Sequence, residues 1–380
     1  MVLYTGLMRS CLRPGQGGFI LAATLIVLAI LAAGAAYFAS RVDNMREGAF
    51  HLQASAEAER DAHTSRQMLL FAFATEPRSG SALLVPDGPL VLDGRLYAIG
   101  EHTNISVQDE RGLLSVNVTR ERELRRFLAA LGLPLERQSR LIDTLADYID
   151  IDDLKRINGA ERADYEKAGL APPANDYLVS HDELKRIPGW IEFFGDLHRA
   201  GGQAAVDRVL RLFDADRSGG INVNTAPREV LRAIGGLDPG RIEALLDQRN
   251  LTPFITIAQL APFTNGPLDD ELTQVVGTNS LRVTHSRDDL PFLLECRLVL
   301  TPSAIDVPVQ ANQCRRRLRE PQAAGNDDAA LLVGNLAKAS AGFDTRQNLI
   351  RPEREINSQF IQPHPEIEKL DWLRLPAARR

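Results

Sequence analysis

The alternation of apolar and polar positions first separates a membrane-spanning segment from the rest of the chain. Residues 19–39 carry no charged side chain and are almost wholly apolar, and Arg41, Asp43 and Arg46 follow directly. At ~1.5 Å per residue, a helix of this length crosses the ~30 Å hydrocarbon core of a bilayer. The pattern therefore predicts a transmembrane helix over residues 19–39.

The helical pattern continues beyond the apolar run. Residues 40–76 contain no proline and one glycine, Gly48, and they are rich in alanine with charges on one side. Pro77 and Gly80 then interrupt the pattern, because both residue types disfavour helix interiors. We therefore expect one stem helix that starts in the membrane and continues through residues 40–76.

Strand patterns occur twice, before and after a helical segment. The alternation in "NISVQDERGLLSVNV", with turn residues at 109–112, predicts a hairpin, and "LRVTH", "PFLLECRLVL" and "VPVQANQCRRRL" predict further strands after residue 279. Residues 119–279 show helical spacing instead. One face carries Leu141, Ile142, Leu145, Tyr148 and Ile149. Ser180 with Glu183 forms a capping box.

This order predicts an α+β fold. We expect a stem helix, a sheet built from residues 77–118 and 280–318, and an inserted helical domain over residues 119–279. Residues 319–380 have little periodicity and are expected to be mostly disordered. Within them "EIEKLDWLRLP" is compatible with a short docking helix, although a solvated tail is the simpler interpretation.

Composition and charge narrow the function classes. The chain has 380 residues, a net charge of −6 and three cysteines. An acidic chain is a poor match for nucleic acid, and three cysteines are too few for a disulfide scaffold or a zinc site of usual spacing. Arg9 and Arg13 precede the apolar run without any acidic neighbour, which predicts that the bulk of the chain is translocated. The sequence has no CxxC, HExxH, GxSxG or P-loop pattern, so we do not expect an enzyme.

The segment "RPGQGGFILAATLIVLAI" resembles the class III leader of type IV pilins and pseudopilins. The resemblance implies that a prepilin peptidase removes residues 1–18 by cutting between Gly18 and Phe19 and methylates the new terminus. An ordinary signal peptide and a plain membrane anchor remain as alternatives. The apolar run is longer than the ~7–15 residues of a usual signal peptide, and no break precedes Arg41.

Ala23 departs from the pattern of most members of that family, which carry a glutamate fifth after the cut. A carboxylate at bilayer depth is costly unless it meets a cation. The resemblance implies that a subunit without the carboxylate needs no partner above it. One minor pseudopilin class lacks this glutamate and caps the filament.

Several ordered blocks resemble the type II secretion minor pseudopilin K family. They are "YAIGEHTNISVQDERGLLSVNV", "LADYIDIDD" with "NGAE", "LVSHDELKRIPGW" and "INVNTAPREVLRAI", and the resemblance covers about residues 13–318. It implies a pilin-like sheet with an inserted helical domain, at the tip of a secretion pseudopilus. The implied partners are the other minor pseudopilins, the prepilin peptidase, the inner-membrane assembly platform and exported proteins. The implied location is a single-pass inner-membrane anchor with a periplasmic head.

A rival interpretation comes from "INVNTAPREVLRAIGGLDPGRIEALLDQR", which resembles a DNA-binding helix-hairpin-helix of competence proteins. A membrane-anchored DNA-uptake protein is therefore the alternative function. Asp238 stands in the hairpin where a phosphate would lie, and the four arginines of this stretch are matched by acidic residues. We therefore expect no nucleic-acid partner.

The stretch "DADRSGGIN" resembles the first part of an EF-hand loop. The candidate calcium ligands are Asp214, Asp216, Ser218, Gly220 and Asn222. The twelfth position is Thr225 instead of a bidentate glutamate, so another carboxylate is needed, for which Asp150, Asp152 and Asp153 are candidates. Calcium is known in helical domains of the resembled family. The alternative is a polar turn.

Cys296 and Cys314 flank a predicted strand-to-strand turn and would face each other across a hairpin. They are a candidate disulfide in an oxidising compartment, and two free thiols are the alternative. Cys11 would leave with the leader. The charge runs "DDLKR", "HDELKR" and "CRRRLRE" are interpreted as solvated faces.

Overall fold

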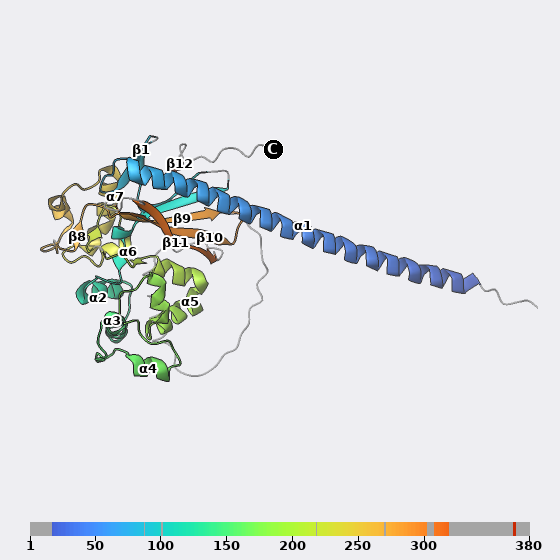
Figure 1. The fold of residues 1–380 in the computed structure, drawn as a ribbon, viewed down its shortest axis with the longest axis horizontal. Helices are drawn as coiled ribbons and strands as arrows, with labels where there is room; N and C mark the ends of the chain where they lie inside the picture. The colour runs from blue at the N-terminus through green and yellow to red at the C-terminus, as the bar shows by residue number, and fades with distance from the viewer. Residues whose placement is uncertain are drawn as a thin grey trace, which may run out of the picture. The chain divides into compact units, whose positions relative to one another are not determined.

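The computed structural model describes residues 17–86, 88–99, 102–217, 219–269, 271–301, 308–318 and 368–369. The chain divides into two compact units, Met1–Glu57 and Ala58–Arg380. In the first unit the described residues belong to helix α1, Gly17–Thr75, which continues without interruption into the second unit (Figure 1). Its apolar window has a mean hydropathy of 2.4, so α1 is long and apolar enough to cross a membrane.

The second unit is organised around a six-stranded sheet with strand order β11-β10-β9-β4-β3-β12. All pairs are antiparallel except β12 with β3. The bounds of the strands are β3 Asp93–Ala98, β4 Thr103–Asp109, β9 Ser280–Arg287, β10 Phe292–Leu300, β11 Val309–Leu318 and β12 Glu368–Lys369.

The last turns of α1 cover one face of this sheet (Figure 1). Leu69 and Phe73 of α1 join a buried apolar cluster with Ile105 of β4 and Val283 of β9. Alternate residues of β4 are buried, which is the two-residue period expected for a strand with one covered face. The cluster therefore explains why the apolar residues of the strands point to the face of the sheet that α1 covers, and why the apolar residues at the end of α1 point toward the sheet.

The predicted hairpin over residues 104–118 is wrong. β4 ends at Asp109, whose side chain accepts a hydrogen bond from the Arg111 backbone N–H and caps the 3-10 turn η1, Glu110–Gly112. The next strand, β5 Leu114–Ser115, pairs in parallel with β6 Phe213–Asp214. The chain therefore leaves the sheet at Asp109 and enters the helical insert. A separate antiparallel hairpin precedes β3 and consists of β1 Ala82–Val85 and β2 Gly88–Val91.

The insert consists of short helices around an aromatic core. Trp190 stacks edge-on against Phe213 at 5.5 Å between ring centroids, and Phe127 does so at 5.2 Å. The Trp190 indole donates to Leu141 O at 2.9 Å. Its helices are α2 Glu121–Ala130, α3 Leu135–Ile149, α4 Arg162–Lys167, α5 Trp190–Leu210, α6 Arg228–Leu231 and α7 Ile242–Leu251, with the 3-10 turns η2 His181–Arg186, η3 Pro239–Arg241 and η4 Ile257–Phe263.

One further strand pair lies within the insert, where β7 Ile221–Asn222 runs parallel to β8 Thr273–Gln274. The predicted helical face is buried at Leu141, Ile142, Leu145 and Tyr148, and Ile149 at its end is partly buried against the same core. The predicted α+β class, with a long helix, an antiparallel sheet and added helices, is confirmed.

The C-terminal tail contributes one short element to the described part of the chain. Glu368 and Lys369 pair with Tyr97 and Ala98 of β3. The prediction of a docking helix over "EIEKLDWLRLP" is therefore wrong at Glu368 and Lys369, which form a strand. The rest of residues 319–380 lies outside the described residues, as does the expectation of disorder there.

Candidate functional site

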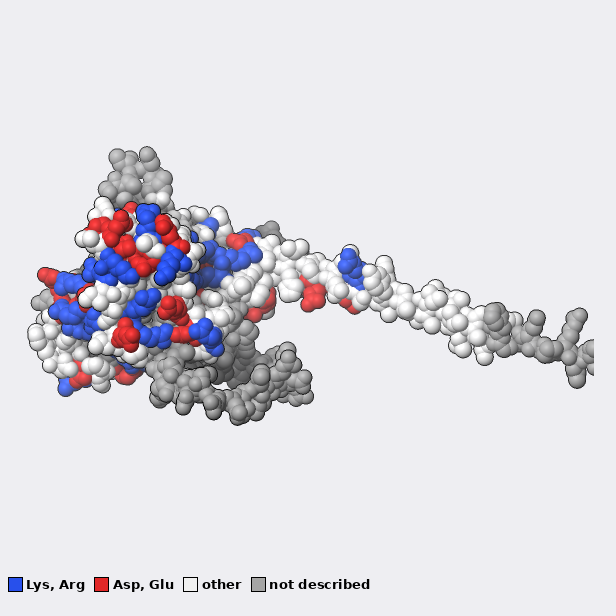
Figure 2. Space-filling model, turned by 90° about the horizontal axis from the view of Figure 1, so that it is seen from below, with Lys and Arg blue, Asp and Glu red and all other residues white. Residues whose placement is uncertain are grey.

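The anchor end of the chain contains the predicted processing site. Gly18 and Phe19 lie in the first turn of α1, and residues 1–16 of the leader lie outside the described residues. Beyond the junction the large apolar side chains point outward all around the helix, with exposed fractions of 66% for Ile20 and 58% for Leu25. Ala23 lies among them in the sequence. Figure 2 shows no Lys, Arg, Asp or Glu on the described part of this end of the stem. A helix that is apolar all round requires lipid or other helices as its surroundings.

The first half of the predicted calcium loop is already satisfied by protein groups. Asp214 is buried in β6 and accepts a hydrogen bond from the Asp216 backbone N–H at 2.6 Å. The Asp216 carboxylate lies 2.9 Å from the Arg297 guanidinium, which also lies 2.6 Å from Glu110. Burial, and then the neighbouring Glu110, raise the pKa of Asp214 well above its ordinary value. Arg297 thus supplies the positive charge at this loop.

The second half of the loop turns its polar atoms elsewhere. The Asn222 amide donates to Gly80 O at 2.7 Å and to Asp109 Oδ2 at 2.8 Å, so it holds the insert to the end of β4. Gly220 adopts a φ of +88°, which favours glycine. Ser218 lies outside the described residues. The residues predicted from the EF-hand pattern therefore do not fit a cation site of that type. Among the described residues no three acidic, histidine or cysteine side chains are close enough to hold a metal ion.

Unsatisfied carboxylate oxygens lie instead at the loop between α3 and α4, which contains the candidates Asp150, Asp152 and Asp153. Glu161 is 6% exposed, and its side chain faces the Asp164 backbone N–H in a capping-box arrangement, without a hydrogen bond of normal geometry to either carboxylate oxygen. Burial, and then Asp147 and Asp150, raise the pKa of Glu161 to about 7. Asp150 Oδ1 is likewise buried without a partner. Because unsatisfied buried carboxylates are costly, this cluster is a better fit for a cation than the predicted loop.

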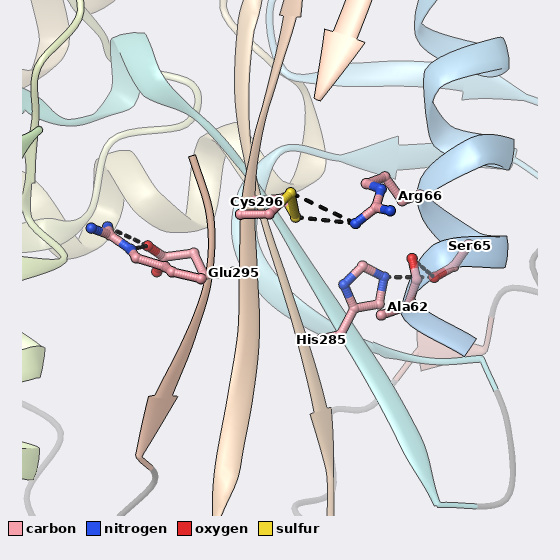
Figure 3. The surroundings of a disulfide bond; sticks show 8 residues. Ala62, Ser65, Arg66, His285, Glu295 and Cys296 are labelled. Carbon is pink, nitrogen blue, oxygen red and sulfur yellow. Dashed lines mark hydrogen bonds and ion pairs between the residues drawn. A yellow bond between two sulfur atoms is a disulfide. The ribbon is translucent and has the colours of Figure 1, made fainter. Parts of the chain in front are cut away.

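Cys296 and Cys314 form a disulfide that joins β10 to the edge strand β11 (Figure 3). Their Cα atoms are 4.1 Å apart, across a bulge in which Gln313 has a φ of +50°. Arg66 of α1 reaches both sulfurs, with Nη1 3.4 Å from Cys296 Sγ and 3.6 Å from Cys314 Sγ. The disulfide therefore lies on the face of the sheet that α1 covers.

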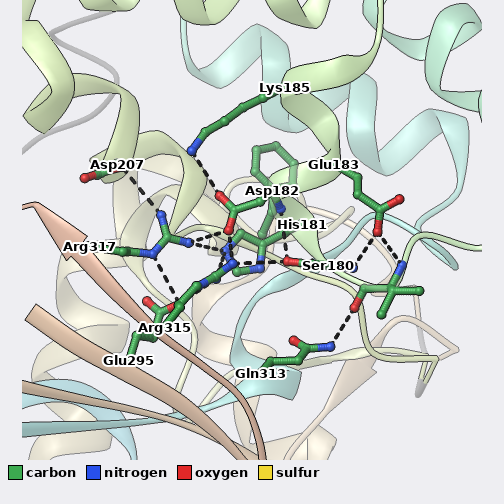
Figure 4. A network of polar contacts seen from close by, with 12 residues as sticks. Ser180, His181, Asp182, Glu183, Lys185, Asp207, Glu295, Gln313, Arg315 and Arg317 are labelled. Carbon is green, nitrogen blue, oxygen red and sulfur yellow. Dashed lines mark hydrogen bonds and ion pairs between the residues drawn. The ribbon is translucent and has the colours of Figure 1, made fainter. Parts of the chain in front are cut away.

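The opposite face of β11 contacts the insert through buried charges (Figure 4). Arg317 Nη2 lies 3.0 Å from Asp182 Oδ2 of η2, and Arg317 Nε lies 3.3 Å from Glu295 Oε1 of β10. Arg315 contacts the same two carboxylates. The interpretation of "HDELKR" and "CRRRLRE" as solvated faces is therefore wrong for these residues, whereas "DDLKR" is exposed throughout.

His181 lies at the centre of this ion-pair cluster. Its Nε2 lies 3.1 Å from Arg315 Nη2 and 3.2 Å from Arg317 Nη2. Burial, and then Arg282 and the other two arginines, lower the pKa of His181 well below its ordinary value. The imidazole is thus neutral and accepts hydrogen bonds at Nε2. Sequence reasoning missed this cluster, although Arg315 and Arg317 at alternate positions of a predicted strand share one face.

The hairpin that resembles a DNA-binding motif is occupied by protein contacts. A Cβ on Gly235 would lie 2.3 Å from Arg126 Nη1, and one on Gly236 would lie 2.3 Å from Pro267 O. Arg249 Nη1 donates to Val223 O and Ala226 O, at 2.9 and 2.6 Å. Because of these contacts, neither the glycine backbone nor Arg249, one of the four arginines, is free to bind a DNA phosphate.

Comparison with known proteins identifies the region of the fold that is shared. Two family models, both described as type II secretion system (T2SS) protein K, match residues 103–192 and 221–279. Type II secretion system protein K of Pseudomonas aeruginosa strain PAO1 is 28% identical over 196 residues, which are 46% of this chain and 51% of that protein. The match thus spans about half the length of that relative.

Among solved structures, a chain of the GspK-GspI-GspJ complex from the type 2 secretion system of enterotoxigenic Escherichia coli is similar in fold. It is 18% identical, with a TM-score of 0.49 over 73% of this chain and 99% of that chain.

Proposed function

We propose that the chain is a member of the type II secretion system protein K family, and that it is a minor pseudopilin that caps the tip of a secretion pseudopilus. In this role it supports protein export across the outer membrane and acts as a structural component, not as an enzyme. The observation that carries the proposal is the placement of both family models, in order, on β4 and the helical insert, behind a single apolar stem helix.

The stem supplies the packing of the filament and explains why this subunit would end it. Apolar side chains cover the whole circumference of α1 around Ala23, so they can pack against neighbouring stems. A subunit stacked above would bring its terminal amine near this position. Ala23 offers no carboxylate to that amine, and an unpaired charge at bilayer depth is costly. The insert, fixed to the sheet by Arg315 and Arg317, adds bulk that opposes further stacking.

The partners follow from this assignment. We propose that a prepilin peptidase cuts between Gly18 and Phe19 and methylates the new terminus, and that the mature chain then meets the inner-membrane assembly platform. The other minor pseudopilins are its neighbours at the tip, and exported proteins are a further partner. In this arrangement α1 is a single-pass inner-membrane anchor and the head lies in the periplasm.

Deletion of the chain in its native host tests the proposal. Secretion of a reporter exoprotein should be lost and should return with the full-length chain, and the other minor pseudopilins should co-purify with that chain. Normal secretion in the deletion strain would contradict the assignment. Binding of duplex DNA by the head at low salt, lost on charge reversal in the Gly235–Gly236 hairpin region, would favour the DNA-uptake alternative instead.

We further propose that calcium binds at the α3–α4 loop, through Asp147, Asp150 and Glu161. The buried oxygens of Asp150 and Glu161 that lack partners support this position over the loop at Asp214. A bound cation would neutralise Glu161 and join α3 to the start of α4, without any catalytic step. The side chains would have to turn toward one another, because they do not converge as they stand.

Thermal unfolding with and without calcium tests this site. The full chain in detergent should gain melting temperature in millimolar calcium, since a ligand that binds only the folded state stabilises it by mass action. Glu161→Gln should remove the gain, whereas Asp216→Asn, in the loop already paired with Arg297, should keep it. Loss of the gain in Asp216→Asn alone would return the site to the loop at residues 214–222.

A further inference from the structure

The head contains two apolar cores that do not merge. One core lies between the end of α1 and the sheet, and its described members fall within residues 68–107 and 281–311. The other core lies inside the insert, and its described members fall within residues 114–275. Because the two sets share no residue, each core is complete within its own part of the chain. The insert is therefore held against the sheet by the layer of side chains between the two cores.

The face of the sheet that meets the insert presents polar side chains to it. In β9, Leu281 and Val283 belong to the core under α1, whereas Arg282 between them points to the insert. The Arg282 guanidinium donates to two backbone carbonyls of the insert, Arg211 O at 3.0 Å and Phe213 O at 2.7 Å. Such alternation is typical of an antiparallel sheet with one covered face and one face in water. The insert thus covers a face whose side chains are suited to solvent.

The ionisable groups on the two sides of this layer differ in sign. The sheet contributes one carboxylate, Glu295, and the guanidinium groups of Arg282, Arg297, Arg315 and Arg317. The insert and the adjoining turn η1 contribute the cations Lys185 and Arg211, the neutral His181, and the carboxyl groups of Glu110, Asp182, Asp207, Asp214 and Asp216. The sheet side is therefore mainly positive and the insert side mainly negative, which favours their contact.

One end of the layer consists of ion pairs between β11 and the insert (Figure 4). Arg317 Nη2 lies 3.0 Å from Asp182 Oδ2, and Arg317 Nη1 lies 3.6 Å from Asp207 Oδ1. Arg315 pairs with Asp182 as well. We refer to Arg315, Arg317, Asp182 and Asp207 as the latch. When the latch opens, all four charges regain water, and this hydration offsets much of the attraction that is lost.

The other end of the layer carries both chain connections between sheet and insert, after Asp109 and before Ser280. The donors at this end are neutral. The Asn222 amide and the Thr225 hydroxyl donate to Asp109 Oδ2 at 2.8 and 2.9 Å, and the Thr278 backbone N–H donates to Asp109 Oδ1 at 2.9 Å. Buried contacts of this kind are screened little by salt, so this end should stay closed when the latch opens.

We propose that the insert is a hinged domain, which the latch holds closed on the sheet and which turns about the Asp109 end when the latch opens. Opening separates charged groups and leaves both apolar cores intact, so it requires less free energy than unfolding of the head. Salt favours the open form, because it screens the attraction between the positive and the negative side. The movement lies within the head and does not depend on the tip assignment.

Thiol labelling of the full-length chain in detergent tests the hinge, in a Cys11→Ser background in which the two remaining cysteines are bonded to each other. The probe at the latch is His181→Cys, because this side chain is 5% exposed and contacts two arginines of the latch. Val223→Cys and Val283→Cys place a probe in each apolar core, where both side chains are fully buried. Ser280→Cys places a buried probe at the hinge end.

The latch probe should respond to salt, and the other three should not. Between about 0.1 M and about 1 M sodium chloride the Debye length falls from about 10 Å to about 3 Å. Labelling at position 181 should accelerate by about tenfold over this range, because its rate follows the population of the open form. Asp182→Asn should accelerate labelling at position 181 at low salt. The matched control is Asp176→Asn, an exposed aspartate before the latch, which should leave the rate unchanged.

Equal labelling rates at positions 181 and 223 would overturn the proposal, since the insert would then leave the sheet only when the head unfolds. A rate at position 181 that salt does not change would do the same. Salt-dependent labelling at position 223 or 283 would indicate unfolding of a core, and rapid labelling at position 280 would exclude a hinge at that end. If His181→Cys does not fold, Ala215→Cys replaces it, because Ala215 lines one small cavity with Arg282 and Arg297 in the same layer.

Discussion

Arg317, near the end of the edge strand β11, lies 3.0 Å from Asp182, at the start of the 3-10 turn η2 in the insert. The two residues are 135 positions apart, and both belong to charge runs. Because Arg317 is also paired with Glu295 in the neighbouring strand, it links the sheet and the helical domain through one guanidinium. The insert is therefore tied to the sheet at a point remote from the chain connections at Asp109 and Ser280.

Arg317→Ala should destabilise the head strongly. Its side chain is 8% exposed, and its removal leaves the buried Glu295 and the partly buried Asp182 with fewer cationic partners. Breaking a buried pair on one side costs about 3–5 kcal/mol. The adjacent Arg316→Ala is the matched control, because its pair with Glu59 is half exposed and such pairs contribute about 0–1 kcal/mol. Urea unfolding of the two variants measures the difference, and equal effects would contradict the role of Arg317.

Removal of the disulfide should lower stability without changing the fold. The bond closes a segment of sequence separation 18, for which the chain-entropy relation gives about 3 kcal/mol. Cys296→Ser with Cys314→Ser should therefore unfold at lower urea concentration. A reductant should bring the wild-type midpoint down to that of the variant and leave the variant unmoved. A wild-type midpoint insensitive to reductant would mean that the thiols are free.

His285 should contribute a loss of stability to the head as the pH falls from 6.5 toward 3. Burial, and then Arg66, lower the pKa of His285 from 6.5 to about 3. Between pH 6.5 and 3 the unfolded chain therefore binds a proton at this histidine that the folded chain does not bind. The contribution of His285 to the free energy of unfolding then falls by up to about 1.4 kcal/mol for each unit of decreasing pH. Above pH 6.5 neither state is protonated, so the stabilisation is complete there.

His285→Leu should reduce this slope, and the buried His181, whose pKa is also lowered, should account for part of what remains. Ser65 loses its 2.5 Å contact with His285 in the variant but keeps its hydrogen bond to Asp61 O at 2.8 Å. Denaturation midpoints measured at several pH values give the slope. The exposed His102→Leu serves as the control, and an unchanged slope in His285→Leu would refute the assignment.

Processing should occur at the start of the apolar helix. The mature chain should begin at Phe19, and Gly18→Leu should leave the precursor uncut, because a Cβ at this position obstructs close approach of a peptidase to the backbone. N-terminal sequencing and the intact mass of the membrane-inserted protein decide this. A mature terminus after Ala36 or Ala39 would identify an ordinary signal peptide.

Ala23→Glu should weaken assembly or leave it unimproved. The change places a carboxylate at bilayer depth, at about 2.5–3.5 kcal/mol unless it is paired. At a filament tip no terminal amine lies above to pair with it. Co-purification with the other minor pseudopilins and secretion of a reporter exoprotein measure the outcome. Better assembly, with incorporation along the shaft, would argue that the subunit belongs to the filament body.

Local patterns in the sequence were sufficient to predict the elements whose buried side is marked by a regular spacing of apolar residues. The uncharged run of residues 19–39 and the absence of proline up to Pro77 determined the stem helix, since hydropathy and backbone preference act within one segment. Alternating positions in 280–318 determined β9 to β11 in the same way. The apolar face of α3 followed from its spacing, because burial of one helix side leaves a period of 3.6 residues.

Only the tertiary structure decided which polar residues meet. Asp109 ends β4 because Asn222, Thr225 and the Thr278 backbone, all more than 100 residues away, converge on its carboxylate, so the expected hairpin does not form. Asp214 and Asp216 match a pattern of cation ligands in the sequence, but in the fold Arg297 of β10 pairs with Asp216, and Glu110 of η1 lies close enough to raise the pKa of Asp214. From the sequence, Arg315 and Arg317 are expected to be solvated, whereas in the fold the turn η2 lies over them. A single ion pair or buried hydrogen bond leaves no periodic trace along the chain, so its partner is defined by the fold and not by local sequence.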